Sequence, residues 1–224
     1  MIPWVKLDTA RVPGADGELR LMRRGTEFSI MLGSNELMNS RLSGSEAALA
    51  TLACKKIETV KRQHLLIGGL GMGFTLRAAL AVLGPDARID VAELVPAVVA
   101  WARGPMAEIF GGCLDDPRVR IAEQDVLHVI RTHKGAFDAI LLDVDNGPEG
   151  LTRSGNDALY DLKGLRSAFA ALRPGGVLAV WSSGPNAAFS KRLRSAGFDV
   201  NEVVVRATGK GGGARHVIWI AVRN

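Results

Sequence analysis

The sequence predicts an α/β protein built on a doubly wound, mostly parallel sheet. Short apolar segments of strand length alternate with helical segments between residues 64 and 196, which is the pattern of successive βα units. The first of these segments, residues 65–67, leads directly into a glycine-rich turn and then a helix. The chain ends in two alternating segments, 198–206 and 215–222, and two strands with no helix between them must pair as an antiparallel hairpin.

Composition places the chain among ordinary globular proteins. With 224 residues, 47% of them apolar, it is long enough for one good-sized domain with a substantial core and a small appendage. No apolar run is long enough to cross a membrane and the N-terminus has no signal-peptide segment, so we expect a cytoplasmic protein. Cys54 and Cys113 are interpreted as reduced packing residues, and the scattered histidines predict no metal site.

The net charge of +5 raises the question of a nucleic-acid partner. The excess of basic residues comes from residues 190–224, where they are spread over a helix, two strands and a loop with few aromatic side chains between them. Proteins that bind single strands interleave such charges with aromatic rings on which bases stack. We therefore interpret these charges as a solvated surface. The expected partner is a small-molecule acceptor, with no membrane and no nucleic acid; the sequence leaves a homodimer open.

Residues 1–42 predict a small β meander, and residues 43–224 predict the α/β domain. Two alternating segments between residues 18 and 32 are joined by a turn and are too short to fold alone. Ser43 and Glu46 then have the spacing of a capping box, in which the two side chains hold the first turn of a helix. This spacing predicts a helix of about 15 residues that packs beside the first central strand.

The α/β domain is expected to contain further strands and helices in alternation. Brief continuous apolar runs mark its strands, because parallel strands are buried on both faces. The expected strands are 87–93, 119–121, 137–142 and 177–181, and the expected helices are 96–107, 126–133, 158–172 and 187–196.

The glycine-rich turn after the first strand predicts a nucleotide-type site. Gly69, Gly71 and Gly73 have no Cβ, so the backbone can turn sharply and approach a ligand, and the following helix presents unpaired N–H groups. A dinucleotide fingerprint, G-x-G-x-x-G, would need glycine where Phe74 stands, which disfavours a nicotinamide-dependent oxidoreductase. The G-x-G-x-G pattern resembles motif I of the class I S-adenosylmethionine-dependent methyltransferases. That resemblance implies a Rossmann-like sheet of seven strands in the order 3-2-1-4-5-7-6, with the last pair antiparallel.

Acidic residues stand at the ends of the next three strands. In an open parallel sheet, ligands bind outside the carboxyl ends of the strands, where Glu93, Asp125 and Asp143 would come together. A carboxylate at Glu93 can accept both ribose hydroxyl protons, Asp125 is placed to reach an adenine amino group, and Asp143 would face the sulfonium. The neighbouring residues Leu94 and Val126 are predicted to line the same cofactor site.

From about residue 65 to residue 181 the chain resembles the spermidine synthase, or aminopropyltransferase, branch of this fold. The matching segments are IGGLGMG at 67–73, ARIDVAEL at 87–94, LDDPRVRI at 114–121, LLDVDNGPEGL at 141–151, ALYD at 158–161 and LRPGGVLAV at 172–180. The resemblance implies a sulfonium cosubstrate, S-adenosylmethionine or its decarboxylated form, and no metal. It also implies that Asp143 holds or deprotonates the attacking amine, and that Asp145, Asn146 and Tyr160 contact the acceptor.

Three features depart from the pattern of that branch. The glycine loop of the family carries an acid that binds the amine of decarboxylated S-adenosylmethionine, and Gly71 stands in its place. The second acid of its D-x-x-D motif, which grips a polyamine, is replaced by Asn146, and Gly44 and Ser45 occupy the place of a Tyr-His pair. An amide supplies no charge for a polycation. Because the amine-binding acid is missing at Gly71, methyl transfer to a small amine acceptor is slightly favoured over aminopropyl transfer in polyamine synthesis.

The sequence thus predicts a spermidine synthase-like transferase. Its chemistry would be an in-line displacement at a carbon activated by the sulfonium, with Asp143 as the catalytic residue that accepts the proton of the amine. The alternatives are an aminopropyltransferase and a non-catalytic nucleoside-binding protein on the same fold. Cofactor binding without turnover on any amine would indicate the non-catalytic protein.

Overall fold

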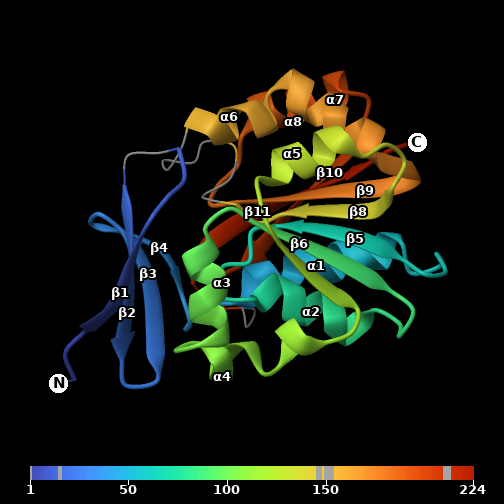
Figure 1. Ribbon diagram of the computed structural model, residues 1–224. Coiled ribbons are helices and arrows are strands. Elements are labelled where there is room, and N and C mark those ends of the chain that lie inside the picture. The colour runs from blue at the N-terminus through green and yellow to red at the C-terminus, as the bar shows by residue number, and fades with distance from the viewer. Residues whose placement is uncertain (1, 15–16, 145–147, 149–153, 209–212) are drawn as a thin grey trace.

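The N-terminal segment forms a small antiparallel sheet of its own beside a larger α/β unit (Figure 1). The structure is a computed structural model that describes residues 2–14, 17–144, 148, 154–208 and 213–224. The predicted meander is a four-stranded sheet, and the two strands expected between residues 18 and 32 are its central pair. Its strands, in spatial order, are β1 (Val5–Arg11), β2 (Glu18–Arg24), β3 (Glu27–Leu32) and β4 (Asn35–Asn39).

The large sheet has seven strands in the order β10-β11-β9-β8-β5-β6-β7, which confirms the predicted order 3-2-1-4-5-7-6. The C-terminal hairpin is antiparallel as predicted, and β5 lies centrally between β8 and β6 in parallel pairing. The strands are β5 (His64–Gly68), β6 (Arg88–Glu93), β7 (Val119–Glu123), β8 (Phe137–Leu142), β9 (Leu172–Ser182), β10 (Asp199–Arg206) and β11 (Arg215–Val222).

Helices cover both faces of the large sheet, and each face has its own apolar core (Figure 1). Every residue of β8 is buried, as expected for a strand enclosed by two helical layers. One layer contains α1 (Gly44–Lys56), α2 (Phe74–Val82), α3 (Pro96–Arg103), α4 (Ala107–Phe110) and the 3-10 turn η1 (Cys113–Asp115). The other contains α5 (Val126–Thr132), α6 (Ser154–Tyr160), α7 (Leu162–Ala171) and α8 (Ala187–Ser195).

Two predicted helices are each divided in the structure. The helix expected at 96–107 breaks at Gly104, and the helix expected at 158–172 breaks at Asp161. Gly104 closes α3 because its N–H donates to the last carbonyls of that helix. The Asp161 carboxylate accepts a hydrogen bond from Gly164 N at 2.6 Å, so this residue caps the start of a new helix.

The predicted capping box at the start of α1 is wrong. Ser43 precedes the helix, but its side chain makes no capping hydrogen bond. The Glu46 carboxylate instead accepts a hydrogen bond from the hydroxyl of Ser45, at 2.7 Å. The acidic residue that the spacing assigned to helix capping is therefore available for another purpose.

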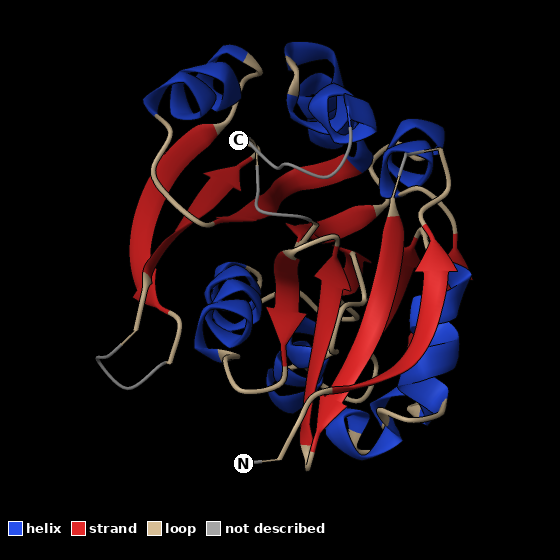
Figure 2. Ribbon diagram, turned by 90° about the vertical axis from the view of Figure 1, so that its left-hand side faces the viewer, coloured by secondary structure: helices blue, strands red, loops and turns tan. Residues whose placement is uncertain are grey.

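The small sheet shares its core with one face of the large unit. Leu21, Phe28 and Ile30 belong to the same buried cluster as residues of α1, α2 and α3. The indole Nε1 of Trp101 on α3 donates a hydrogen bond of 2.6 Å to the Asp8 carboxylate on β1. Figure 2 views the molecule from the side of the small sheet, whose strands stand beside the helices of this layer. This shared packing holds the small sheet in place beside the large one.

Both cysteines are buried and free, and burial raises the pKa of Cys54 to about 12 and that of Cys113 to about 11. Such thiols are poor nucleophiles, because the thiolate is the reactive form. No helix in the described ranges is long and apolar enough to span a membrane. Among the same residues, no three side chains of the metal-binding types come together.

Because the core is shared, shortening a buried side chain of the small sheet should destabilise the whole chain. Leu21→Ala is expected to lower the free energy of unfolding by about 2–5 kcal/mol, while denaturation stays a single cooperative transition. Val5→Ala, at a position on the same sheet that is 54% exposed, serves as the control. An unchanged main transition with a separate early one in Leu21→Ala would show that the small sheet folds independently.

Candidate nucleoside and amine site

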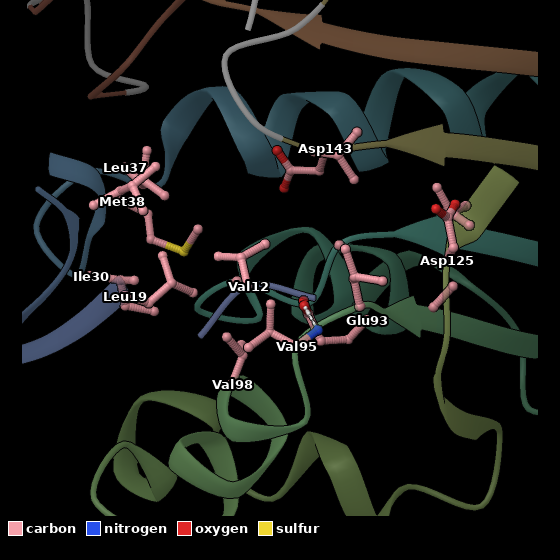
Figure 3. Close-up of a pocket in the computed structure, with 17 residues that line it drawn as sticks. Val12, Leu19, Ile30, Leu37, Met38, Glu93, Val95, Val98, Asp125 and Asp143 are labelled. Atoms are coloured by element: carbon pink, nitrogen blue, oxygen red, sulfur yellow. Dashed lines mark hydrogen bonds between the residues drawn. The ribbon is translucent and has the colours of Figure 1, made fainter. Parts of the chain in front are cut away.

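A cavity lies between the carboxyl ends of the central strands and the small sheet (Figure 3). Its volume is about 130 Å³. The wall formed by the large sheet is polar and contains Gly69, Gly71, Glu93, Asp125 and Asp143. The wall formed by the small sheet and the residues around it is apolar and contains Val12, Leu19, Ile30, Leu32, Leu37 and Met38. Acidic and apolar groups thus face the same space from two separate sheets.

The glycine turn between β5 and α2 forms part of this wall. Gly69, Gly71 and Gly73 have φ angles of +88°, +51° and +75°, values that other residues adopt only with strain. A Cβ on Gly69 would collide with the backbone carbonyl of Asp143, so this glycine lets the turn pass close to the end of β8. Gly73 lines neither of the two cavities found in the described part of the chain; it packs against the ring of Phe110.

Glu93 joins the glycine turn to the helix that follows β6. One carboxylate oxygen accepts a hydrogen bond from Leu70 N at 2.9 Å, and the other accepts one from Val95 N at 2.9 Å. The residue is 8% exposed, and burial raises the pKa of its carboxyl group while these backbone N–H groups lower it. The backbone N–H groups of Gly71 and Leu94 also lie near this carboxylate and lower its pKa. The contact of Glu93 with a ribose remains a prediction. The sequence did not indicate that Glu93 also bridges the glycine turn and α3.

The residues after β7 and β6 contribute the far end of the same cavity. Asp125 lines it and also caps α5, because its side chain accepts a hydrogen bond from Leu127 N at 2.7 Å. Val126 and Leu94 line the cavity as predicted from their positions beside the acids. The predicted cofactor residues at the ends of β6, β7 and β8 therefore do converge on one space.

Asp143 is a buried acid of this cavity whose pKa is raised. The pKa of its carboxyl group is raised to about 7, mainly by burial and also by the nearby charge of Glu46. Thr75 acts in the opposite direction, since its hydroxyl donates a hydrogen bond of 2.6 Å to the Asp143 carboxylate. A carboxyl group that titrates near neutral pH can both accept and release a proton under ordinary conditions.

Three predicted acceptor residues are not seen in the cavity walls. Asp145 and Asn146 lie outside the described residues. The Tyr160 ring is buried against Phe189, with the ring centres 5.7 Å apart, and Tyr160 lines neither described cavity. Its hydroxyl donates to the carbonyl of Val144 at 3.4 Å, which supports the segment that follows Asp143.

Sequence reasoning missed several residues around Asp143. Thr75 follows the glycine turn and is buried, and Glu46 comes from α1, where its spacing suggested a cap. Trp181, near the end of β9, lines a second cavity that also contains Glu46 and Asp143. An isolated aromatic residue at a strand end carries no local signal of such a role. The apolar wall from the small sheet was equally invisible, because its residues resemble ordinary core positions.

The strand order and the site at the carboxyl ends of β5, β6 and β8 define the class I S-adenosylmethionine-dependent methyltransferase fold. Spermidine synthase from Thermotoga maritima superposes with a TM-score of 0.77 at 17% identity, over 98% of this chain and 73% of that one. A spermidine synthase in complex with the transition-state analogue AdoDATO gives a TM-score of 0.76 at 17% identity, over 98% and 72%. At this identity the likeness shows the fold.

Similarity in sequence to curated proteins identifies the family more narrowly than the similarity in fold does. The polyamine aminopropyltransferase of Mycobacterium tuberculosis is 33% identical over 193 residues, or 82% of this chain and 35% of the relative. Polyamine aminopropyltransferase 1 of Streptomyces coelicolor is 30% identical over 148 residues, or 62% and 27%. No family model matches the chain. The chain belongs to the spermidine synthase-like branch of this fold, and it spans only about a quarter to a third of the length of these two curated relatives.

The raised pKa of Asp143 makes stability depend on pH. The folded protein holds this proton up to a pKa of about 7, against an ordinary pKa of 3.8 for an aspartic acid, so stability falls as the pH rises through that interval. Asp143→Asn should therefore match the wild type near pH 4 and exceed its free energy of unfolding by roughly 2–4 kcal/mol at pH 8.

Chemical denaturation at a series of pH values measures this difference. Asp86→Asn, a substitution of the same kind at an exposed position, should show no such dependence. A gain for Asp143→Asn that is the same at pH 4 and pH 8 would show that the Asp143 carboxyl is already ionised at low pH.

Proposed function

We propose that this chain transfers the aminopropyl group of decarboxylated S-adenosylmethionine to an amine. The observation that carries the proposal is the convergence of Glu93, Asp125 and Asp143 on one cavity at the strand ends, in a chain of the spermidine synthase-like branch. The relatives that match it are aminopropyltransferases by name. Aminopropyl transfer, the alternative in the sequence analysis, therefore replaces methyl transfer as the favoured reaction.

The preference for methyl transfer came from one missing acid at Gly71. The structure supplies a local reason for glycine there: its φ is +51°, and a Cβ would lie 3.1 Å from the sulfur of Met38. Close packing with the small sheet thus accounts for the missing side chain without reference to the cosubstrate. The likeness to aminopropyltransferases extends over 193 residues, and it outweighs a change at one position.

The cavity suits a nucleoside with an apolar extension. Glu93 would accept hydrogen bonds from the ribose hydroxyls, and Asp125 one from the adenine amino group. Gly69 and Gly71 line the cavity with backbone and without a side chain. The bound cosubstrate supplies a carbon that is activated by its attachment to a sulfonium, so a neutral amine can displace the thioether as the new C–N bond forms and the C–S bond breaks.

Asp143 then provides the proton acceptor. An alkylammonium has no free electron pair, so the amine must lose a proton before or during the displacement. A carboxylate with a pKa of about 7 can take that proton near neutral pH and release it to solvent afterwards. Thr75 holds the carboxylate by its 2.6 Å hydrogen bond, which fixes the direction from which the amine approaches.

The identity of the transferred group can be measured directly. The protein is incubated with a mixture of small primary amines and either S-adenosylmethionine or its decarboxylated form, and mass spectrometry distinguishes added methyl from added aminopropyl groups. We expect aminopropylated amines from the decarboxylated form alone. Methylated products from S-adenosylmethionine would overturn the proposal. Nucleoside binding without any product would indicate a non-catalytic binding protein.

The nucleoside contact of Glu93 is tested by binding of methylthioadenosine, the thioether product. Glu93→Gln keeps the shape of the side chain but turns one acceptor into a donor, so it should weaken binding at least tenfold, about 1.4 kcal/mol. Glu123→Gln is the control, because Glu123 ends the neighbouring strand and is exposed. Equal affinities for Glu93→Gln and the wild type, measured by calorimetry, would remove Glu93 from the nucleoside site.

A further inference from the structure

A second cavity adjoins the first on the side of α1. Its volume is about 70 Å³, roughly half that of the larger cavity. The two cavities have Leu37, Met38, Gly71 and Asp143 in common, so Asp143 stands at their junction. A ligand in the smaller cavity would therefore lie next to a nucleoside in the larger one. The two ligands would meet at Asp143, the proposed proton acceptor.

Two carboxylates face this smaller cavity. Glu46 lines it from α1 and Asp143 from the end of β8, and the charge of Glu46 raises the pKa of Asp143, which indicates that the two groups are close. The hydroxyl of Thr75 donates to the Asp143 carboxylate at 2.6 Å and contacts the backbone carbonyl of Glu46 at 3.4 Å, which places the end of β8 beside the first turn of α1. Two like charges beside a small space make it favourable for a cation.

Within the described residues, neither carboxylate is neutralised by an ion pair with lysine or arginine. Glu46 accepts a hydrogen bond from Ser45, whose hydroxyl also contacts His216 Nδ1 at 2.9 Å. Burial lowers the pKa of His216, although the charge of Glu46 raises it, so this ring is largely neutral at pH 7. The described residues thus supply no lysine or arginine that would compensate this negative charge.

The rest of the lining is apolar or aromatic. Leu37, Met38, Phe74 and Trp181 provide most of it, and the side chain of Asn39 is already engaged, since its Nδ2 donates to Glu36 at 3.1 Å. The indole Nε1 of Trp181 is buried and has no hydrogen-bond partner in the described part of the chain. Apart from the two carboxylates, this N–H and the amide of Asn39, the described lining offers a ligand mainly hydrocarbon and aromatic surface.

We propose that the smaller cavity binds the acceptor, and that this acceptor is a primary monoamine with an apolar body. The inference rests on the proposed function. The ammonium group would lie between Glu46 and Asp143, and the apolar body against Phe74 and Trp181, whose rings also attract an alkylammonium. A diamine would place its second ammonium against the apolar lining, where a charge is costly to bury. Glu46 is then a specificity residue that selects the charged end of the substrate.

The test measures amine binding without turnover. Protein saturated with methylthioadenosine is titrated with 2-phenylethylamine, a monoamine with an apolar body, and with putrescine, a diamine. We expect the wild type to bind 2-phenylethylamine at least tenfold more tightly than putrescine. Glu46→Gln should weaken 2-phenylethylamine at least tenfold and leave the affinity for methylthioadenosine unchanged.

Glu58→Gln is the matched control, because it removes the same charge from an exposed position just beyond the end of α1. Equal or tighter binding of putrescine, no amine binding, or unchanged amine affinity in Glu46→Gln would each overturn the proposal. The comparison of the two amines needs only the wild type, so it decides the question even if the variant does not fold. The amine titrations are repeated without methylthioadenosine. Failure of methylthioadenosine to bind would count against the proposed function, whereas the amine titrations would still test the amine site.

Discussion

The site depends on a buried carboxylate that is held by backbone amides. Glu93, at the end of β6, bridges Leu70 N in the glycine turn and Val95 N at the start of α3, each at 2.9 Å. A buried charge is tolerated only where hydrogen bonds replace its hydration, and backbone N–H groups supply them here. Because one side chain joins the turn to the helix, the two segments that form the polar wall keep a fixed separation.

The small N-terminal sheet completes the cavity with apolar side chains. The small sheet contributes an apolar wall, and its buried residues continue the core of the helical layer next to it. Acids on one side and hydrocarbon on the other create a space that is partly dry, in which electrostatic effects are stronger than in water. This environment explains the pKa of about 7 at Asp143, since burial is its main cause.

Two departures of this chain from the pattern of its branch concern acids that bind amine groups. Gly71 and Asn146 stand where that pattern has an acid, and Glu46 and Asp143 both line the smaller cavity. The proposed monoamine acceptor rests on these two carboxylates and on the apolar lining beside them.

Much of the fold and half of the site could be predicted from the sequence, because their signals are local. Apolar runs identified β5, β6 and β8, the glycines marked the turn, and an acid directly after a strand must lie at the carboxyl edge of the sheet. Only the tertiary structure decided which side chains from distant parts of the chain point into the same cavity. Glu46, Asp143 and Trp181 meet because α1 packs beside the ends of β8 and β9. The capping-box spacing of Glu46 is equally compatible with a helix cap and with a side chain turned into a cavity, and the choice between them depends on what packs around α1.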